Sequence, residues 1–172
     1  GSIAFGPDGI LFVASPTTDS IRRYDVASAT DLGALVPSGA AGLFEPTDLT
    51  FGPGGDLFVV SRRSHSVLRF DSLSGGLDSV FVPSRSGGLL FPDSLTFGPD
   101  GQLYVSSSRT DSVLRFNGAS GVFVNAFIRS GLGGLSRPLG MEFTPNGALS
   151  VTSSDTNEVL RYAGPLPAEC VQ

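Results

Sequence analysis

Apolar and polar residues follow one pattern that recurs every 46 residues along the chain. The clearest copy, SLTFGPDGQLYVSSSRTDSVLRF, runs from Ser94 to Phe116. Its three short apolar runs are separated by a Pro-Asp-Gly turn and by a polar corner, which predicts three β-strands joined by hairpins. One aromatic residue marks the end of the first run in each copy: Phe5, Phe51, Phe97 and Phe143. The chain therefore consists of four copies of one unit.

The first hairpin of each copy has the sequence Gly-Pro-Asp-Gly or a close variant. Pro presets φ at the first turn position, and Asp or Asn followed by Gly tolerates the reversal of the chain. The strand after this turn is apolar on both sides in most copies, which predicts that it is buried between two packed sheets. We expect Phe51, Phe97, Val59 and Val105 to be largely buried there.

A third strand follows the polar corner in every copy, at residues 21–24, 67–70, 113–116 and 159–162. A weaker fourth strand is predicted at residues 34–36, 80–82 and 126–128, and a Gly-rich link then leads to Pro46, Pro92 or Pro138. The fourth copy has Pro165 and Pro167 where the approach to its fourth strand should lie. We therefore expect the last unit to lack that strand.

Four strands per unit, a period in the forties and no helical pattern predict an all-β fold. The expected architecture is a β-propeller built from four 46-residue blades, each a four-stranded antiparallel sheet, with the last blade lacking its outer strand. A β-solenoid is the main alternative, but its repeats are usually shorter and lack such a hairpin. Residues 1–172 are expected to form a single propeller domain or propeller arc, with blades at approximately 1–46, 47–92, 93–138 and 139–172.

The repeated string FGPDGxLYVSSxxTDSVLRF resembles the NHL-type repeats of secreted bacterial six-bladed-propeller-like proteins. The resemblance covers nearly the whole chain. It implies the propeller fold and an extracytoplasmic or secreted location. It implies no single activity, because such blades serve many unrelated roles.

Composition narrows the choice of partners. All eleven basic residues are Arg and the formal net charge is −5, so the chain is a poor candidate for nucleic acid, whose binding depends on clustered cations. No apolar run approaches the roughly 20 residues that span a membrane. The single cysteine, Cys170, cannot form an internal disulfide. Because the sequence starts at Gly1 rather than Met, we expect a processed, excised or recombinant chain.

Two polar positions hold the same residue in every copy: the arginines Arg23, Arg69, Arg115 and Arg161, and the serines Ser15, Ser61, Ser107 and Ser153. One hypothesis is a ring of guanidinium groups that binds carboxylates or an anionic polymer. We favour a structural role, in which each arginine buries its stem and ties neighbouring blades through carbonyls or carboxylates. The serine hydroxyls are expected to bond the backbone at the corner.

Candidate ligand-binding residues are those that differ between the copies. One corner position holds Asp19, His65, Asp111 and Asn157. If the corners line one mouth of the propeller, these side chains converge and could hold a divalent cation. The alternative is that they cap turns. Glu142 is the one charged residue at its first-strand position, so we expect it to face the central channel or to pair with an arginine between blades.

The sequence contains no catalytic constellation that we recognise. His65 is the only histidine, which excludes a His-rich zinc site and weakens comparison with propeller lyases and amidating enzymes, and no G-x-S-x-G motif exists. We favour a non-enzymatic binding or structural scaffold module, without cofactor, that uses a propeller face or blade edge to bind protein or glycan. The alternative is a metal-dependent hydrolase or lactonase with a site at the channel mouth. Because an incomplete ring exposes apolar faces, we expect a homo-oligomer or another chain that completes the ring or the last blade. The alternative is that the four units close within one chain as a small four-bladed ring.

Overall fold

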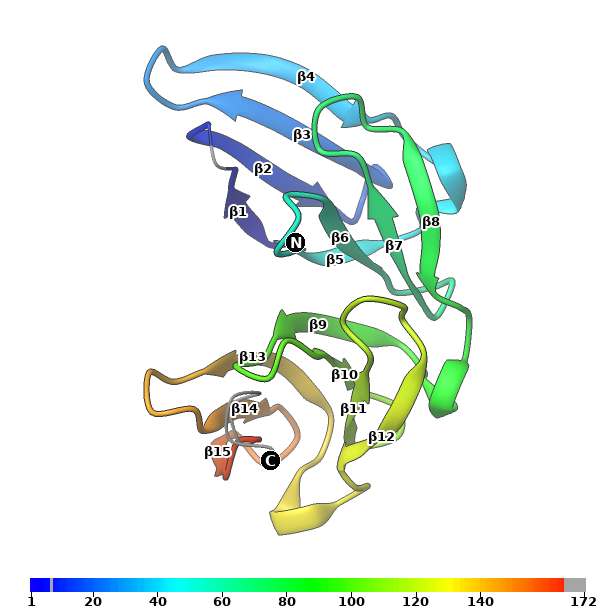
Figure 1. Ribbon diagram of the computed structural model, residues 1–172, viewed down its shortest axis with the longest axis vertical. Coiled ribbons are helices and arrows are strands. Elements are labelled where there is room, and N and C mark those ends of the chain that lie inside the picture. Colours follow the sequence, from blue (N-terminus) through cyan, green and yellow to red (C-terminus); the bar gives the residue numbers. More distant parts are fainter. Residues whose placement is uncertain (7, 166–172) are drawn as a thin grey trace. The chain divides into compact units, whose positions relative to one another are not determined.

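The computed structural model describes residues 1–6 and 8–165, and within them the chain forms four antiparallel sheets (Figure 1). Each sheet is one propeller blade, and its strands follow one another in chain order, which confirms the predicted fold. The first two blades contain β1 (Ile3–Phe5), β2 (Ile10–Ser15), β3 (Ser20–Asp25) and β4 (Thr30–Val36), then β5 (Pro46–Phe51), β6 (Leu57–Ser61), β7 (Ser66–Phe70) and β8 (Leu77–Val82). The last two contain β9 (Pro92–Phe97), β10 (Leu103–Ser107), β11 (Ser112–Phe116) and β12 (Phe123–Ile128), then β13 (Pro138–Phe143), β14 (Leu149–Ser153) and β15 (Glu158–Tyr162).

The chain divides into two compact units, each with two blades. We call Gly1–Ser84 the N-terminal unit and Arg85–Gln172 the C-terminal unit. In the N-terminal unit, Phe12, Ile21 and Val36 of the first blade form one core with Leu57 and Phe70 of the second. In the C-terminal unit, a core of the same kind joins Tyr104, Val113 and Ile128 to Leu149 and Val151. Blades within a unit therefore pack face to face, with their apolar side chains between the sheets.

The turn between the first two strands of a blade forms as its sequence predicts. In the third blade, the Gly101 N–H donates to the Gly98 carbonyl at 2.9 Å, and the Asp100 carboxylate accepts the Gln102 N–H at 3.2 Å. Gly101 has a φ of 70°, in the left-handed region that glycine enters without steric cost. Glycine at this position and the preceding Asp therefore close the hairpin for separate physical reasons.

The second strand is buried on both faces in the two middle blades, where every residue of β6 and β10 is buried. Val59 and Val105 are fully buried, as expected. Phe51 and Phe97 are only partly buried, because each ends the first strand of its blade next to the hairpin turn. The Phe51 ring still meets the Phe12 ring edge-on, with 5.1 Å between the ring centroids.

The Gly-rich links contain structure that the sequence did not predict. Each link forms one short 3₁₀ turn, at Ala40–Gly42, Ser86–Gly88 and Leu132–Gly134. The outer strands also extend further toward their N-termini than predicted, and the first strands of the last three blades begin at Pro46, Pro92 and Pro138. Pro is tolerated there because the first position of a strand need not donate to the ladder.

The last blade has three strands in the described part of the chain, with order β13-β14-β15. This agrees with the expectation that it lacks an outer strand. Pro167 and Cys170 lie outside the described residues. Among the residues that are described, none belongs to a helix long and apolar enough to cross a membrane.

Candidate binding site

A hollow of about 400 Å³ lies in the N-terminal unit, where the polar corners of its two blades meet. We call it the corner hollow; its lining residues are Pro16, Thr17, Asp19, Phe44, Glu45 and Arg63. The first three come from the turn between β2 and β3, the next two precede β5, and Arg63 lies in the turn between β6 and β7. Residues from three separate segments therefore form one surface depression.

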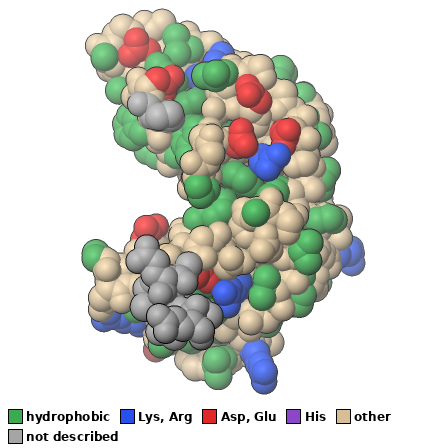
Figure 2. Space-filling model, viewed as in Figure 1, with side chains coloured by type: hydrophobic (Ala, Val, Ile, Leu, Met, Phe, Trp, Pro, Cys, Tyr) green, Lys and Arg blue, Asp and Glu red, His purple; other side chains and the backbone are tan. Residues whose placement is uncertain are grey.

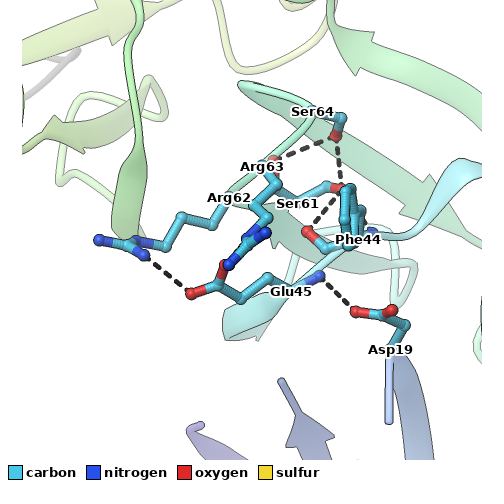
Figure 3. A network of polar contacts seen from close by, with 7 residues as sticks. All are labelled: Asp19, Phe44, Glu45, Ser61, Arg62, Arg63 and Ser64. Atoms are coloured by element: carbon cyan, nitrogen blue, oxygen red, sulfur yellow. Dashed lines mark hydrogen bonds and ion pairs between the residues drawn. The ribbon is translucent and has the colours of Figure 1, made fainter. Parts of the chain in front are cut away.

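Asp19 fixes the backbone at the entry to the second blade. Its Oδ1 accepts the Glu45 N–H at 2.7 Å, and its backbone carbonyl accepts the Gly39 N–H at 3.0 Å (Figure 3). Asp19 has a φ of 49°, in the left-handed region where Asp and Asn are enriched. The turn conformation thus directs this carboxylate onto the neighbouring blade.

The Glu45 carboxylate lies between two guanidinium groups. Its Oε1 is 2.8 Å from Arg62 Nη1 and its Oε2 is 2.6 Å from Arg63 Nε (Figure 3). Burial alone would raise the pKa of Glu45, but the hydrogen bonds and charges of Arg63 and Arg62 outweigh it, so that this pKa lies below its ordinary value. Glu45 is therefore ionised at neutral pH.

Phe44 and Arg63 form the exposed side of the hollow. The Arg63 guanidinium lies 5.4 Å from the Phe44 ring centroid, and 46% of Phe44 is exposed. The backbone behind this ring is fixed, because the Phe44 N–H donates to the buried Ser61 hydroxyl at 2.9 Å. The hydrogen bond to Ser61 thus fixes the backbone that carries the ring, and the ion pair with Glu45 holds the guanidinium beside it.

The same positions interact in the C-terminal unit with different chemistry. The pair 18 residues apart is Glu45/Arg63 in the second blade, Phe91/Arg109 in the third and Arg137/Asp155 in the fourth. Arg109 lies 5.4 Å from the Phe91 ring centroid, and Arg137 Nη1 lies 3.8 Å from Asp155 Oδ1. Our sequence analysis missed these pairs, although their constant spacing within the repeat was a signal that could have identified them.

The four candidate corner residues share one conformation. Asp19, His65, Asp111 and Asn157 have φ values of 49°, 55°, 49° and 56°. Asp111 acts as Asp19 does, since its Oδ1 accepts the Arg137 N–H at 2.7 Å. Among residues 1–6 and 8–165, no three or more His, Cys, Asp or Glu side chains come together in a way that could hold a metal ion. Glu142 is exposed on β13, opposite Ser150 of β14.

The repeated serines bond the backbone of the preceding link. Ser107 Oγ accepts the Leu90 N–H at 2.9 Å, and Ser153 Oγ accepts the Ser136 N–H at 3.0 Å, as Ser61 does with Phe44. The Ser15 hydroxyl accepts a hydrogen bond from Thr18 Oγ1 at 2.7 Å. In the three later blades this serine therefore connects the second strand to the link that enters the blade.

The repeated arginines have different partners in different blades. Arg115 Nη2 lies 2.7 Å from Asp100 Oδ2 in the turn of its own blade, whereas Arg69 pairs with Asp78 of the outer strand β8. Arg23 Nη1 lies 3.5 Å from the Leu73 carbonyl of the neighbouring blade. Arg161 is exposed on β15. Within each unit, arginine side chains on the face shown in Figure 2 lie apart from one another rather than in one patch.

Comparison with known proteins identifies the fold. No protein-family model and no curated protein sequence matches this chain. A putative 6-phosphogluconolactonase from Bacteroides uniformis is 21% identical, with a TM-score of 0.71 over 95% of this chain and 50% of that one. An inactive variant of virginiamycin B lyase from Staphylococcus aureus is 16% identical, with a TM-score of 0.69 over 96% of this chain and 56% of that one.

A third solved structure, an auxiliary nutrient binding protein from Bacteroides thetaiotaomicron, is 16% identical, with a TM-score of 0.66 over 90% of this chain and 45% of that one. The chain thus spans about half the length of the solved structures that it matches. Their names cover a lyase, a lactonase and a binding protein. Similarity at this level shows the β-propeller fold and does not transfer an activity.

Proposed function

We propose that this chain is a non-enzymatic binding and scaffold module of the NHL-repeat type, which binds a protein or glycan partner through a propeller face. The observation that carries the proposal is the corner hollow. It presents a half-exposed aromatic ring beside a guanidinium group and two carboxylates, and hydrogen bonds already fix their positions. A site ordered before binding loses less conformational entropy when a ligand arrives.

The charges in the hollow favour a ligand without strong net charge. The Glu45 carboxylate is neutralised by Arg62 and Arg63, and one oxygen of Asp19 is used by the backbone. The exposed Phe44 face offers an apolar surface next to hydrogen-bonding groups, as suits a sugar ring or a polar peptide segment. For the alternative, a metal-dependent hydrolase or lactonase, no observation on the described residues provides specific support.

The test is a search for ligands followed by substitution in the hollow. A glycan array and a display library of peptides would each be screened with the labelled chain, and the ligand found would be titrated into the Phe44→Ala and Arg63→Gln variants. We expect each substitution to weaken binding at least tenfold, while the matched Phe123→Ala variant, which alters an exposed aromatic of the C-terminal unit, binds normally. Ligands that bind these three variants equally would contradict the assignment of the hollow.

We also propose that the chain associates with another copy or with another chain that supplies further blades. Ile3 and Val159 are 62% and 69% exposed. Their equivalents that face a neighbouring blade of the same unit are buried: Leu49 at 4%, Met141 at 8%, Ile21 and Val113 at 0%. Apolar positions that the repeat buries elsewhere are thus exposed on the first and last blades, as expected of association surfaces.

Sedimentation velocity at micromolar concentration tests this association. We expect a species heavier than the 17.8 kDa chain, and a shift toward the monomer in the Val159→Asp variant. A monodisperse species at the monomer mass would refute multi-chain completion. The extracytoplasmic or secreted location that the NHL resemblance implies is also part of the proposal, and fractionation of the source cells tests it.

A further inference from the structure

The strand β15 has a free edge within the described part of the chain. Glu158–Tyr162 pairs with β14 on one side, and no described strand pairs with it on the other. In the first three blades, the equivalent strands β3, β7 and β11 pair on that side with an antiparallel outer strand. An unpaired edge of this kind is a template for strand addition.

The three complete blades show what kind of strand fits this edge. The last residue of the outer strand is apolar and faces the start of the third strand, in the pairs Val36 with Ile21, Val82 with Val67, and Ile128 with Val113. All six residues are at most 1% exposed. Val159 occupies the position of Ile21, Val67 and Val113 but is 69% exposed. In the first and third blades these pairs also pack against the next blade. By analogy, a strand that completes the last blade would end with an apolar residue opposite Val159.

Arg161 favours an added strand that carries negative charge. Arg69 and Arg115 each pair with a carboxylate, supplied by Asp78 of the outer strand in the second blade and by Asp100 of the hairpin turn in the third. In the last blade the turn has Asn146 in place of Asp100, and the exposed Arg161 pairs with no described carboxylate. In the second blade, Asp78 reaches Arg69 from the outer strand β8. The described part of the last blade has no outer strand, so an added strand would supply the equivalent position.

We propose that β15 binds an extended acidic segment of a partner protein by antiparallel strand addition. The segment places an acidic side chain beside Arg161 and, four residues later, an apolar side chain opposite Val159, as Asp78 and Val82 are spaced in β8. The inference rests on the proposed protein-binding role and names the chemistry of the partner. It involves the C-terminal unit alone and is independent of the corner hollow.

A peptide with the chain's own sequence for residues 75–83, GGLDSVFVP, serves as the probe. Amide hydrogen exchange of the intact chain is measured with and without this peptide. We expect new protection of alternate amides in β15, because an added antiparallel strand pairs with alternate residues. We expect weaker binding to a Val159→Asp variant, whose carboxylate would lie opposite the apolar end of the peptide.

A double-mutant cycle isolates the role of charge. Replacing the aspartate of the peptide by asparagine, or Arg161 by glutamine, should each weaken binding about two- to fivefold, and the two changes together should cost little more than one. Arg129→Gln is the matched control, because Arg129 is an exposed arginine of the same unit outside the strands. This control should bind the peptide as the unaltered chain does.

Three results would overturn the inference: peptide binding without protection of β15, equal effects of Arg161→Gln and Arg129→Gln, or protection in the isolated chain of the β15 amides that point away from β14. The last result would mean that another part of this chain, or a second copy, occupies the edge. Oligomers in sedimentation without peptide protection of β15 would leave the proposed association standing and refute only this inference. A monomeric chain whose β15 amides become protected when the peptide is added would refute the proposed association and support this inference.

Discussion

Replacing Arg115 by lysine tests whether the repeated arginine stabilises its blade. Arg115 is 26% exposed, and its Nη2 lies 2.7 Å from Oδ2 of Asp100, a side chain that is only 6% exposed. The same Oδ2 accepts the Tyr104 hydroxyl at 3.0 Å, and the guanidinium lies 6.0 Å from the Tyr104 ring centroid. Burial, and then the charge of Asp100, raise the pKa of Tyr104, so the phenol remains a donor to this carboxylate.

The expected cost lies between two limits. An exposed ion pair contributes roughly 0.2–1 kcal/mol, whereas breaking a buried pair costs about 3–5 kcal/mol. Lysine keeps the charge but loses the planar group that contacts both the carboxylate and the ring. Among the described residues, Arg115 Nε is buried without a hydrogen-bond partner, so the substitution also removes one unsatisfied donor. We therefore expect a loss of about 1–2 kcal/mol, which lowers Tm by roughly 2–8 °C for a chain of this size.

The free energy of unfolding is measured in urea by circular dichroism and by tyrosine fluorescence, since the chain has no tryptophan. Arg129→Lys, in an exposed loop, is the control and should change stability by less than about 0.5 kcal/mol. A loss at Arg115 no larger than in this control would refute the structural role. If the Arg115→Lys variant kept its stability but failed to bind an anionic ligand, the repeated arginines would form an anion-binding site instead.

Three further predictions concern the core and the corner hollow. Phe116→Ala should cost about 3–5 kcal/mol in urea denaturation because this ring is fully buried, and Phe97→Ala should cost less; equal costs would contradict the burial described here. Ser107→Ala should cost about 1–3 kcal/mol, since the Leu90 N–H then loses its acceptor, and a neutral result would show that water replaces the hydroxyl. Glu45→Gln should cost about 1–2 kcal/mol at pH 7. Because the folded-state pKa of Glu45 is lowered, this stabilisation is present above the ordinary Glu pKa of about 4.3 and is lost as pH falls through the lowered value, so the two proteins should converge in stability once the pH is below it.

The sequence was sufficient to predict the blades because each turn and strand pattern occurs in all four copies of the repeat. The Pro-Asp-Gly turns identify the first hairpin, and the doubly apolar second strand identifies the layer between packed sheets. The links were harder to predict, because their conformation depends on left-handed residues that are not all glycine. Ala41, Glu45 and Arg85 have φ values of 57°, 54° and 62°. Such residues carry no local signal, since tertiary contacts hold them in a sparsely populated region.

The candidate site shows a different limit of sequence reasoning. Asp, Asn and His are both metal ligands and residues that tolerate left-handed turns, so Asp19, His65, Asp111 and Asn157 fitted two hypotheses equally. The backbone distinguishes them for Asp19 and Asp111, whose carboxylates each accept a backbone N–H from the next blade. The corner hollow was missed for a related reason. Its main residues, Phe44 and Glu45, lie in a segment that the strand pattern leaves unassigned, and only the folded structure shows that they contact Arg63.

Some positions hold the same residue in every blade and others differ between blades. Which of the two applies depends on what the side chain at that position contacts. Ser61, Ser107 and Ser153 all bond the backbone of a link, and because every blade has that backbone, the same side chain serves in each. The pairs Glu45/Arg63, Phe91/Arg109 and Arg137/Asp155 interact through their side chains, so different attractive groups can occupy the two positions, including a pair of reversed charge. The scaffold thus constrains the geometry of each corner and leaves its chemistry free to differ. One repeat can therefore present several distinct surfaces on the same scaffold.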